Sequence, residues 1–117
     1  MLTPRRPNVL VVDDDDSIRE VIAEVLRDEG YDVACAGNGE QALTEMRKDR
    51  RPDLVLLDLM MPVMSGWELL ELLEVTPELS QIPVVVVSAM SAPGAWESLA
   101  KPIDLDRLLA TVSRLTS

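Results

Sequence analysis

The chain has 117 residues, which is enough for one domain with a substantial core, and it carries a formal net charge of −10 with only 11 lysines and arginines. This acidity, without a basic cluster interleaved with aromatic residues, argues against direct binding of nucleic acid. No apolar stretch is long enough to cross a bilayer and no signal peptide is recognisable, so we expect a cytoplasmic protein without membrane contacts.

Two residue types set further limits on the chemistry. The chain contains no histidine, so a step that needs an imidazole base, a phosphohistidine or an imidazole metal ligand must obtain it from a partner. Cys35 is the only cysteine, which excludes an internal disulfide and fits a reducing compartment. We expect Cys35 to be a small, buried apolar residue on a strand.

Short apolar runs alternate with segments of helical periodicity along the chain. The predicted strands cover residues 9–12, 31–36, 54–57, 82–87 and 98–100. The predicted helices cover residues 17–29 and the segments that follow the cap residues Asn38, Ser65 and Asp104, with Lys48, Arg50 and Arg51 at the carboxyl end of the second helix. Because this alternation is typical of right-handed βαβ units, we expect one α/β domain over residues 1–117, with a parallel sheet and helices on both faces.

The connection between the fourth and fifth predicted strands departs from this alternation of strands and helices. Only nine residues separate Ser88 from the last predicted strand. A parallel crossover normally needs a dozen or more residues, usually with a helix. We therefore predict that the fourth crossover helix is missing or reduced to a loop. The sheet would then be covered either by that loop, including Met90 and Trp96, or by another chain.

Polar side chains follow the apolar strands at one edge of this predicted sheet. Asp13 and Asp14 follow the first strand, Asp58 the third, Ser88 the fourth and Lys101 the last. Each is ordinary by itself, because an aspartate after a strand is commonly a helix N-cap, a serine a turn residue and a lysine solvated surface. Their shared position is informative, since open α/β sheets bind ligands outside the carboxyl ends of their strands.

These residue types together favour phosphoryl chemistry. Carboxylates without histidine or cysteine make a hard oxygen site, which favours Mg²⁺, or Mn²⁺, over zinc or copper. Such an ion keeps positions open for phosphate oxygens. Asp58 can then attack phosphorus and form an aspartyl phosphate, while Lys101 and the Ser88 hydroxyl bind the phosphoryl oxygens.

Several motifs resemble those of the receiver domain of two-component response regulators, and together they cover nearly the whole chain. They are VVDDDDSIREV, GNGEQAL, PDLVLLDLMMPVMSGWELL, IPVVVVSAM and LAKPIDLDRL. The resemblance implies a flavodoxin-like, doubly wound five-stranded parallel sheet with strand order 2-1-3-4-5. It also implies a signalling switch, not an enzyme, that takes a phosphoryl group from a sensor histidine kinase or a histidine phosphotransfer protein and acts on a downstream protein target.

The resemblance also implies a role for each site residue. Asp13, Asp14, Asp58 and the Met60 backbone carbonyl would hold Mg²⁺, and Asp58 would be the phosphoacceptor. Ser88 and Lys101 would contact the phosphoryl group, commonly with a cis bond between Lys101 and its proline. Apolar bulk at Met60 and Met90 would shield the acyl phosphate from water.

Two departures from the family pattern leave a second function open. The segment before the last strand is about ten residues too short for the usual helix, and Ser98 stands where the family usually has Tyr or Phe. The alternative is therefore a phosphorylation-independent interaction module, which would form a homodimer through the face without a helix. A phosphatase is disfavoured because Met60 offers no acid or base, and a flavin site because residues 13–16 would repel a phosphate.

Overall fold

A computed structural model describes residues 6–89 and 95–117 of the protein. Its strands are β1 (Asn8–Val12), β2 (Asp32–Ala36), β3 (Leu54–Leu57), β4 (Val84–Val87) and β5 (Glu97–Leu99). Its helices are α1 (Asp16–Asp28), α2 (Gly39–Met46), α3 (Gly66–Glu74) and α4 (Leu105–Thr116). The predicted elements are confirmed, with ends that differ by one or two residues except at the carboxyl end of α2.

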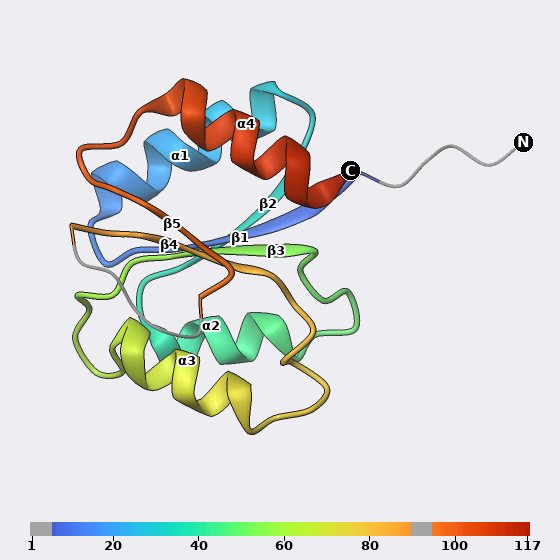
Figure 1. The fold of residues 1–117 in the computed structure, drawn as a ribbon, viewed down its shortest axis with the longest axis vertical. Coiled ribbons are helices and arrows are strands. Elements are labelled where there is room, and N and C mark those ends of the chain that lie inside the picture. The colour runs from blue at the N-terminus through green and yellow to red at the C-terminus, as the bar shows by residue number, and fades with distance from the viewer. Residues whose placement is uncertain (1–5, 90–94) are drawn as a thin grey trace, which may run out of the picture.

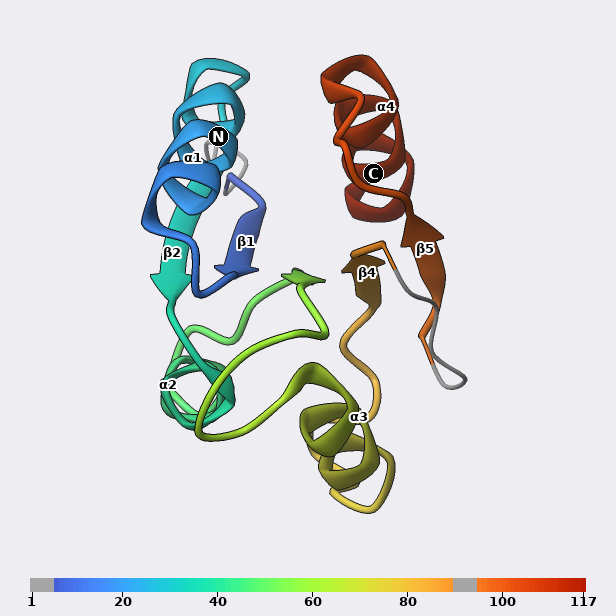
Figure 2. The same ribbon diagram turned by 90° about the vertical axis from the view of Figure 1, so that its left-hand side faces the viewer.

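All five strands are parallel and form one sheet in the order β2-β1-β3-β4-β5. Helices α1 and α4 cover one face of this sheet, and α2 and α3 cover the other (Figures 1 and 2). The predicted doubly wound, flavodoxin-like fold is therefore confirmed.

The alternation of side chains along each strand divides the apolar residues into two cores. On β1, Val9 and Val11 pack toward α1 and α4, whereas Leu10 and Val12 pack toward α2 and α3. All four are at most 1% exposed. A strand that is buried on both faces must be apolar throughout, which explains why β1, β3 and β4 are continuous apolar runs.

No described residue between β4 and β5 is helical, in agreement with the short crossover expected there. The β4 residues Val84 and Val86 are nevertheless 3% and 0% exposed, so this chain itself buries them. Trp96 covers the region only in part, since it is 57% exposed beside a cavity of about 180 Å³. The expectation for Met90 falls outside the described residues.

Two expectations about single residues are wrong. Cys35 is exposed, because β2 is the edge strand and has a neighbouring strand on one side only. Lys48, Arg50 and Arg51 do not end α2, which stops at Met46. Two of them make long-range contacts instead: Arg50 with Asp32 and Arg51 with the Glu78 carbonyl. No helix in the described part of the chain is long and apolar enough to cross a membrane.

Candidate functional site

The register of the sheet brings the predicted site residues to one edge. Val12 of β1 pairs with Leu57 of β3, so Asp13 and Asp58 follow neighbouring strands at the same level. The backbone extends the ladder one step further, because the Asp58 N–H donates to the Val12 carbonyl at 2.9 Å. The positions of both aspartates are thus fixed by backbone pairing rather than by a flexible loop.

Ser88 and Lys101 are held at the same edge by the pairing of β4 with β5. The Ser88 N–H donates to the Leu99 carbonyl at 3.1 Å, and the Lys101 N–H donates to the Ser88 carbonyl at 3.3 Å. Ser88 is only 4% exposed. The peptide bond between Lys101 and Pro102 is cis, as the family resemblance implies.

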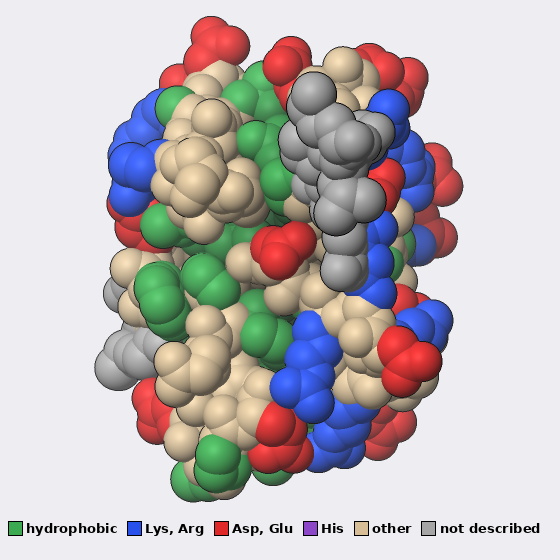
Figure 3. All heavy atoms as spheres, turned by 90° about the vertical axis from the view of Figure 1, so that its right-hand side faces the viewer, with side chains coloured by type: hydrophobic (Ala, Val, Ile, Leu, Met, Phe, Trp, Pro, Cys, Tyr) green, Lys and Arg blue, Asp and Glu red, His purple; other side chains and the backbone are tan. Residues whose placement is uncertain are grey.

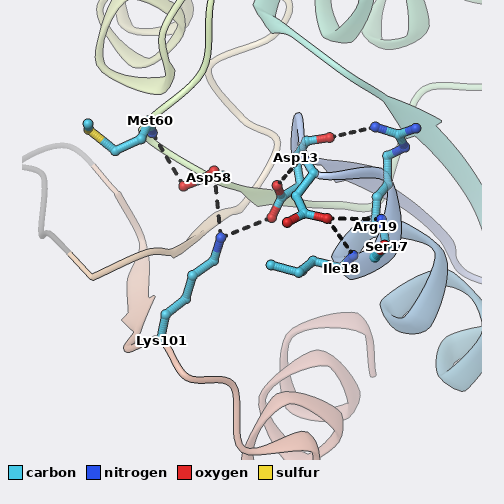
Figure 4. A network of polar contacts seen from close by, with 8 residues as sticks. Asp13, Ser17, Ile18, Arg19, Asp58, Met60 and Lys101 are labelled. Atoms are coloured by element: carbon cyan, nitrogen blue, oxygen red, sulfur yellow. Dashed lines mark hydrogen bonds and ion pairs between the residues drawn. The ribbon is translucent and has the colours of Figure 1, made fainter.

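Lys101 joins the two buried aspartates (Figure 4). Its Nζ lies 3.1 Å from Asp13 Oδ2 and 3.6 Å from Asp58 Oδ2. The two carboxylates are 3% and 6% exposed, and their like charges repel, so the single ammonium between them offsets part of that cost. Residues 88 positions apart in sequence thus form one charged cluster.

The environment shifts the protonation equilibria of this cluster. Burial raises the pKa of Asp58, and the charges of Asp13 and Asp14 raise it further, against the opposing effects of the Met60 N–H and Lys101. Burial lowers the pKa of Lys101, but the hydrogen bond and charge of Asp13 and the charge of Asp58 outweigh it, so the net shift is upward. Asp58 is therefore a more basic carboxylate than usual, beside a lysine that stays charged.

The four consecutive aspartates have four different surroundings. Asp13 is paired with Lys101, Asp15 is the N-cap of α1 and accepts the N–H groups of Ser17 and Ile18, and Asp16 is paired with Arg19. Asp14 is exposed, and its carboxylate has no hydrogen bond or ion pair with any residue that the structure describes. Of the four carboxylates, only that of Asp14 thus lacks a hydrogen bond or ion pair within the described residues.

The donor atoms fit a hard cation. One carboxylate oxygen from each of Asp13, Asp14 and Asp58 lies within 4.8 Å of the other two. Octahedral Mg²⁺, with ligands at about 2.0–2.1 Å, spaces its oxygens by about 3–4 Å. Small side-chain movements would let the three carboxylates share one metal ion. Met60 lies next to the cluster and its N–H donates to Asp58 Oδ1 at 3.3 Å, while the ligand role of its carbonyl stays a prediction.

The family model described as the response regulator receiver domain matches residues 9–113. The chain belongs to this family.

Three receivers or receiver-containing proteins illustrate the similarity. The DNA-binding response regulator MtrA of Mycolicibacterium smegmatis is 41% identical over 116 residues, which are 92% of this chain and 49% of that protein. The structure of chemotaxis protein CheY4 of Vibrio cholerae has a TM-score of 0.85 and 32% identity and covers 95% of this chain and 99% of that one. The structure of the signal receiver domain of a Syntrophus aciditrophicus signal transduction histidine kinase has a TM-score of 0.86 and 30% identity. The match covers 94% of this chain and 89% of that one.

The chain spans about half the length of the curated MtrA relatives that it matches.

Reasoning from the sequence missed two residues beside the candidate site. Arg19 contacts the Asp13 carbonyl, and its position three residues after Asp16 was the available signal. Gly66 lies so close to the backbone that a Cβ atom there would be 2.5 Å from the Asp58 carbonyl oxygen, and a glycine at the start of a capped helix was the signal.

Proposed function

We propose that the protein is a phosphoacceptor switch in which Asp58 accepts a phosphoryl group with the help of Mg²⁺. The observation that carries the proposal is the cluster of Asp13, Asp14, Asp58 and Lys101. Buried like charges are costly, and this arrangement is useful chiefly when a cation and a phosphoryl group complete it. Receiver domains as a family are signalling switches, and membership of that family supports the same function.

The proposed transfer step takes place at Asp58. A carboxylate oxygen of Asp58 attacks the phosphorus of a phosphohistidine, the P–N bond breaks, and the imidazole leaves with the bonding electron pair. The product is a mixed anhydride on Asp58. Because the chain has no histidine, the donor must be a partner, and a sensor histidine kinase or a histidine phosphotransfer protein has the required chemistry.

The neighbouring residues have separate tasks in this step. The Met60 N–H holds one oxygen of Asp58, so the carboxylate is oriented before the donor arrives. Lys101, whose raised pKa keeps it protonated, binds phosphoryl oxygens, as does the hydroxyl of Ser88. Asp13, Asp14, Asp58 and the Met60 carbonyl would hold the Mg²⁺ ion, which when bound neutralises the charge spread over the phosphoryl oxygens.

A labelling experiment tests the proposal. The protein is incubated with a small acyl phosphate and Mg²⁺, and modification is followed by intact mass and peptide mapping. We expect one phosphoryl group on Asp58, no labelling after chelation of Mg²⁺, and none in Asp58→Asn. Asp53→Asn, which alters an exposed aspartate at the other end of the same strand, is the matched control and should label normally. A wild-type chain that never labels, or labelling that persists in Asp58→Asn, would refute the proposal.

The β4–β5 side of the molecule favours a second candidate, a phosphorylation-independent interaction module. Ser98 is exposed and cannot act as an aromatic switch, while Trp96 presents a large apolar surface beside it. Self-association through this side should then be independent of Asp58. Sedimentation velocity of the wild type, Asp58→Ala and Trp96→Ala tests this: a monomer in all three rejects the homodimer, and a dimer lost only in Trp96→Ala supports it.

A further inference from the structure

Arg19 on α1 contacts the turn between β1 and α1, which carries the acidic residues (Figure 4). Its Nη1 donates to the backbone carbonyl of Asp13 at 2.7 Å, and its Nη2 is paired with the Asp16 carboxylate. The Arg19 side chain is 19% exposed, so most of its surface is buried, whereas its partner Asp16 is 79% exposed. One side chain therefore joins the end of β1 to the first turn of α1.

The carboxylate of Asp13 is held without help from Arg19. Its Oδ1 accepts the Asp15 N–H at 2.9 Å, and its Oδ2 accepts from Lys101 at 3.1 Å. Asp58 is likewise held by the Met60 N–H and Lys101. Asp14 differs, because its side chain has no such contact within the described residues, and its direction depends on the backbone alone.

The peptide group that Arg19 holds is the one between Asp13 and Asp14. Fixing the carbonyl oxygen of this peptide fixes its plane, and the plane determines where the Asp14 Cα and side chain begin. We propose that Arg19 is a positioning residue that presents the Asp14 carboxylate to the divalent cation. This inference rests on the proposed function. Residues behind a metal ligand commonly set its orientation, and their loss typically reduces metal affinity by about 10- to 100-fold.

The charges at the site make the direction of the effect informative. Removing Arg19 leaves Asp16 without its partner, which adds a net negative charge near the cation. Electrostatics alone would then tighten the binding of Mg²⁺. A positioning role predicts the opposite, because the Asp14 ligand loses its fixed direction. Tighter Mg²⁺ binding in the variant would therefore indicate a purely electrostatic effect of Arg19, and weaker Mg²⁺ binding would indicate a positioning role.

The test is a calorimetric titration of Mg²⁺ into the metal-free protein. We expect Arg19→Ala to weaken binding by about tenfold and Arg19→Lys, which keeps one donor and the charge, to give an intermediate affinity. Arg27→Ala is the matched control, since it removes an arginine from the other end of α1 whose Nη2 donates to the Val33 carbonyl at 3.4 Å. The Mg²⁺ affinity of this variant should stay within about twofold of the wild type, because Arg27 lies about 12 Å further along α1 than Arg19 at about 1.5 Å per residue, and salt screens its charge over that distance.

A second readout needs no metal. In the metal-free protein, amide hydrogen exchange at Asp15 should be faster in Arg19→Ala than in the wild type, because the turn loses the contact between Arg19 and the Asp13 carbonyl. The exchange of the β3 amides should be unchanged. Exchange that speeds up everywhere would show general destabilisation and overturn the positioning role.

The outcomes separate the two proposals. A wild-type chain that binds no Mg²⁺ would overturn both of them. Wild-type binding together with an unchanged or tighter affinity in Arg19→Ala would overturn the role of Arg19 and leave the phosphoacceptor proposal standing.

Discussion

The two ends of the sheet use charge in opposite ways. At the carboxyl ends, Asp13, Asp14 and Asp58 converge around one lysine, so negative charge remains in excess. At the amino ends, arginines lie beside polar groups of the fold: Arg50 contacts Asp32 and the Arg6 carbonyl, and Arg27 contacts the Val33 carbonyl, although the buried Arg50 Nε has no hydrogen-bond partner in the described part of the chain.

Figure 3 shows the amino-end face, where basic side chains gather along the side formed by α1, β2 and α2. Arg6, Arg27 and Arg50 line a cavity of about 530 Å³ on this side. Their contacts with carbonyls and Asp32 hold the first residues of the fold to β2 and to the loop after α2. The arginines at the amino ends thus have partners within the fold, whereas the carboxylates at the carboxyl ends keep an excess of negative charge, which is the feature that a bound cation would offset.

The largest effect should come from Lys101. Lys101→Met removes the ammonium that pairs with both Asp13 and Asp58, and loss of such a group typically slows the chemical step by about 10²- to 10³-fold. We therefore expect the initial rate of Asp58 labelling to fall at least a hundredfold. Arg50→Met removes a paired cation at the amino ends of the strands. Because this cation does not contact Asp58, the initial rate of labelling should stay within about twofold of the wild-type rate. Equal losses in both variants would contradict the division between the two ends.

The next largest effect should come from Gly66. A Cβ atom there would lie 2.5 Å from the Asp58 carbonyl oxygen and 2.7 Å from Leu59 Cα, both of them backbone atoms that cannot move aside cheaply. Gly66→Ala should reduce the free energy of unfolding by about 1–3 kcal/mol in urea titrations and displace Asp58. In Gly37→Ala, the new Cβ would meet only the side chains of Gln41 and Arg19 at 3.4 and 3.5 Å, so this control should be nearly neutral.

A third prediction concerns Arg50, at the amino ends of the strands. Its pair with Asp32 has an Nη1–Oδ2 distance of 2.6 Å, but the two side chains are 35% and 42% exposed, so solvent screens the interaction. Arg50→Met should lower the free energy of unfolding by about 1 kcal/mol. Urea unfolding with and without Mg²⁺ should give the same difference, and a variant that loses Mg²⁺ binding would disprove the purely structural role.

The smallest effect should be on the pH dependence of stability. The pKa of Asp58 in the fold lies above its ordinary value of 3.8, so ionisation of Asp58 destabilises the folded state. This cost is absent below the unfolded value, grows as the pH rises through it, and is complete above the folded pKa. Without divalent cations, Asp58→Asn should therefore raise the melting temperature at neutral pH and lose this gain below about pH 3.8. Asp49→Asn, on an exposed loop, should show no such gain at any pH.

Much of the fold and the site could be predicted because both depend on strand ends. The apolar runs before Asp13 and Asp58 predict buried parallel strands, and parallel strands present their carboxyl ends at one edge. The short segment before β5 likewise predicted a missing helix from chain length alone.

Other features depend on geometry that a linear pattern does not contain. Cys35 is apolar in type, but its exposure depends on the place of β2 at the edge of the sheet. The contact between Arg19 and the Asp13 carbonyl depends on the angle at which α1 leaves β1. Which of the four aspartates would cap α1 was likewise undecided until the turn was seen, and Asp15 holds that position.

The most direct test of the central claim is a crystal structure of the protein with Mn²⁺, located by its anomalous scattering. The account predicts one ion at the carboxyl ends of β1 and β3, bound by oxygens of Asp13, Asp14 and Asp58 and by the Met60 carbonyl, with Lys101 beside it. An ion bound elsewhere, or no ion at concentrations that support labelling of Asp58, would contradict it.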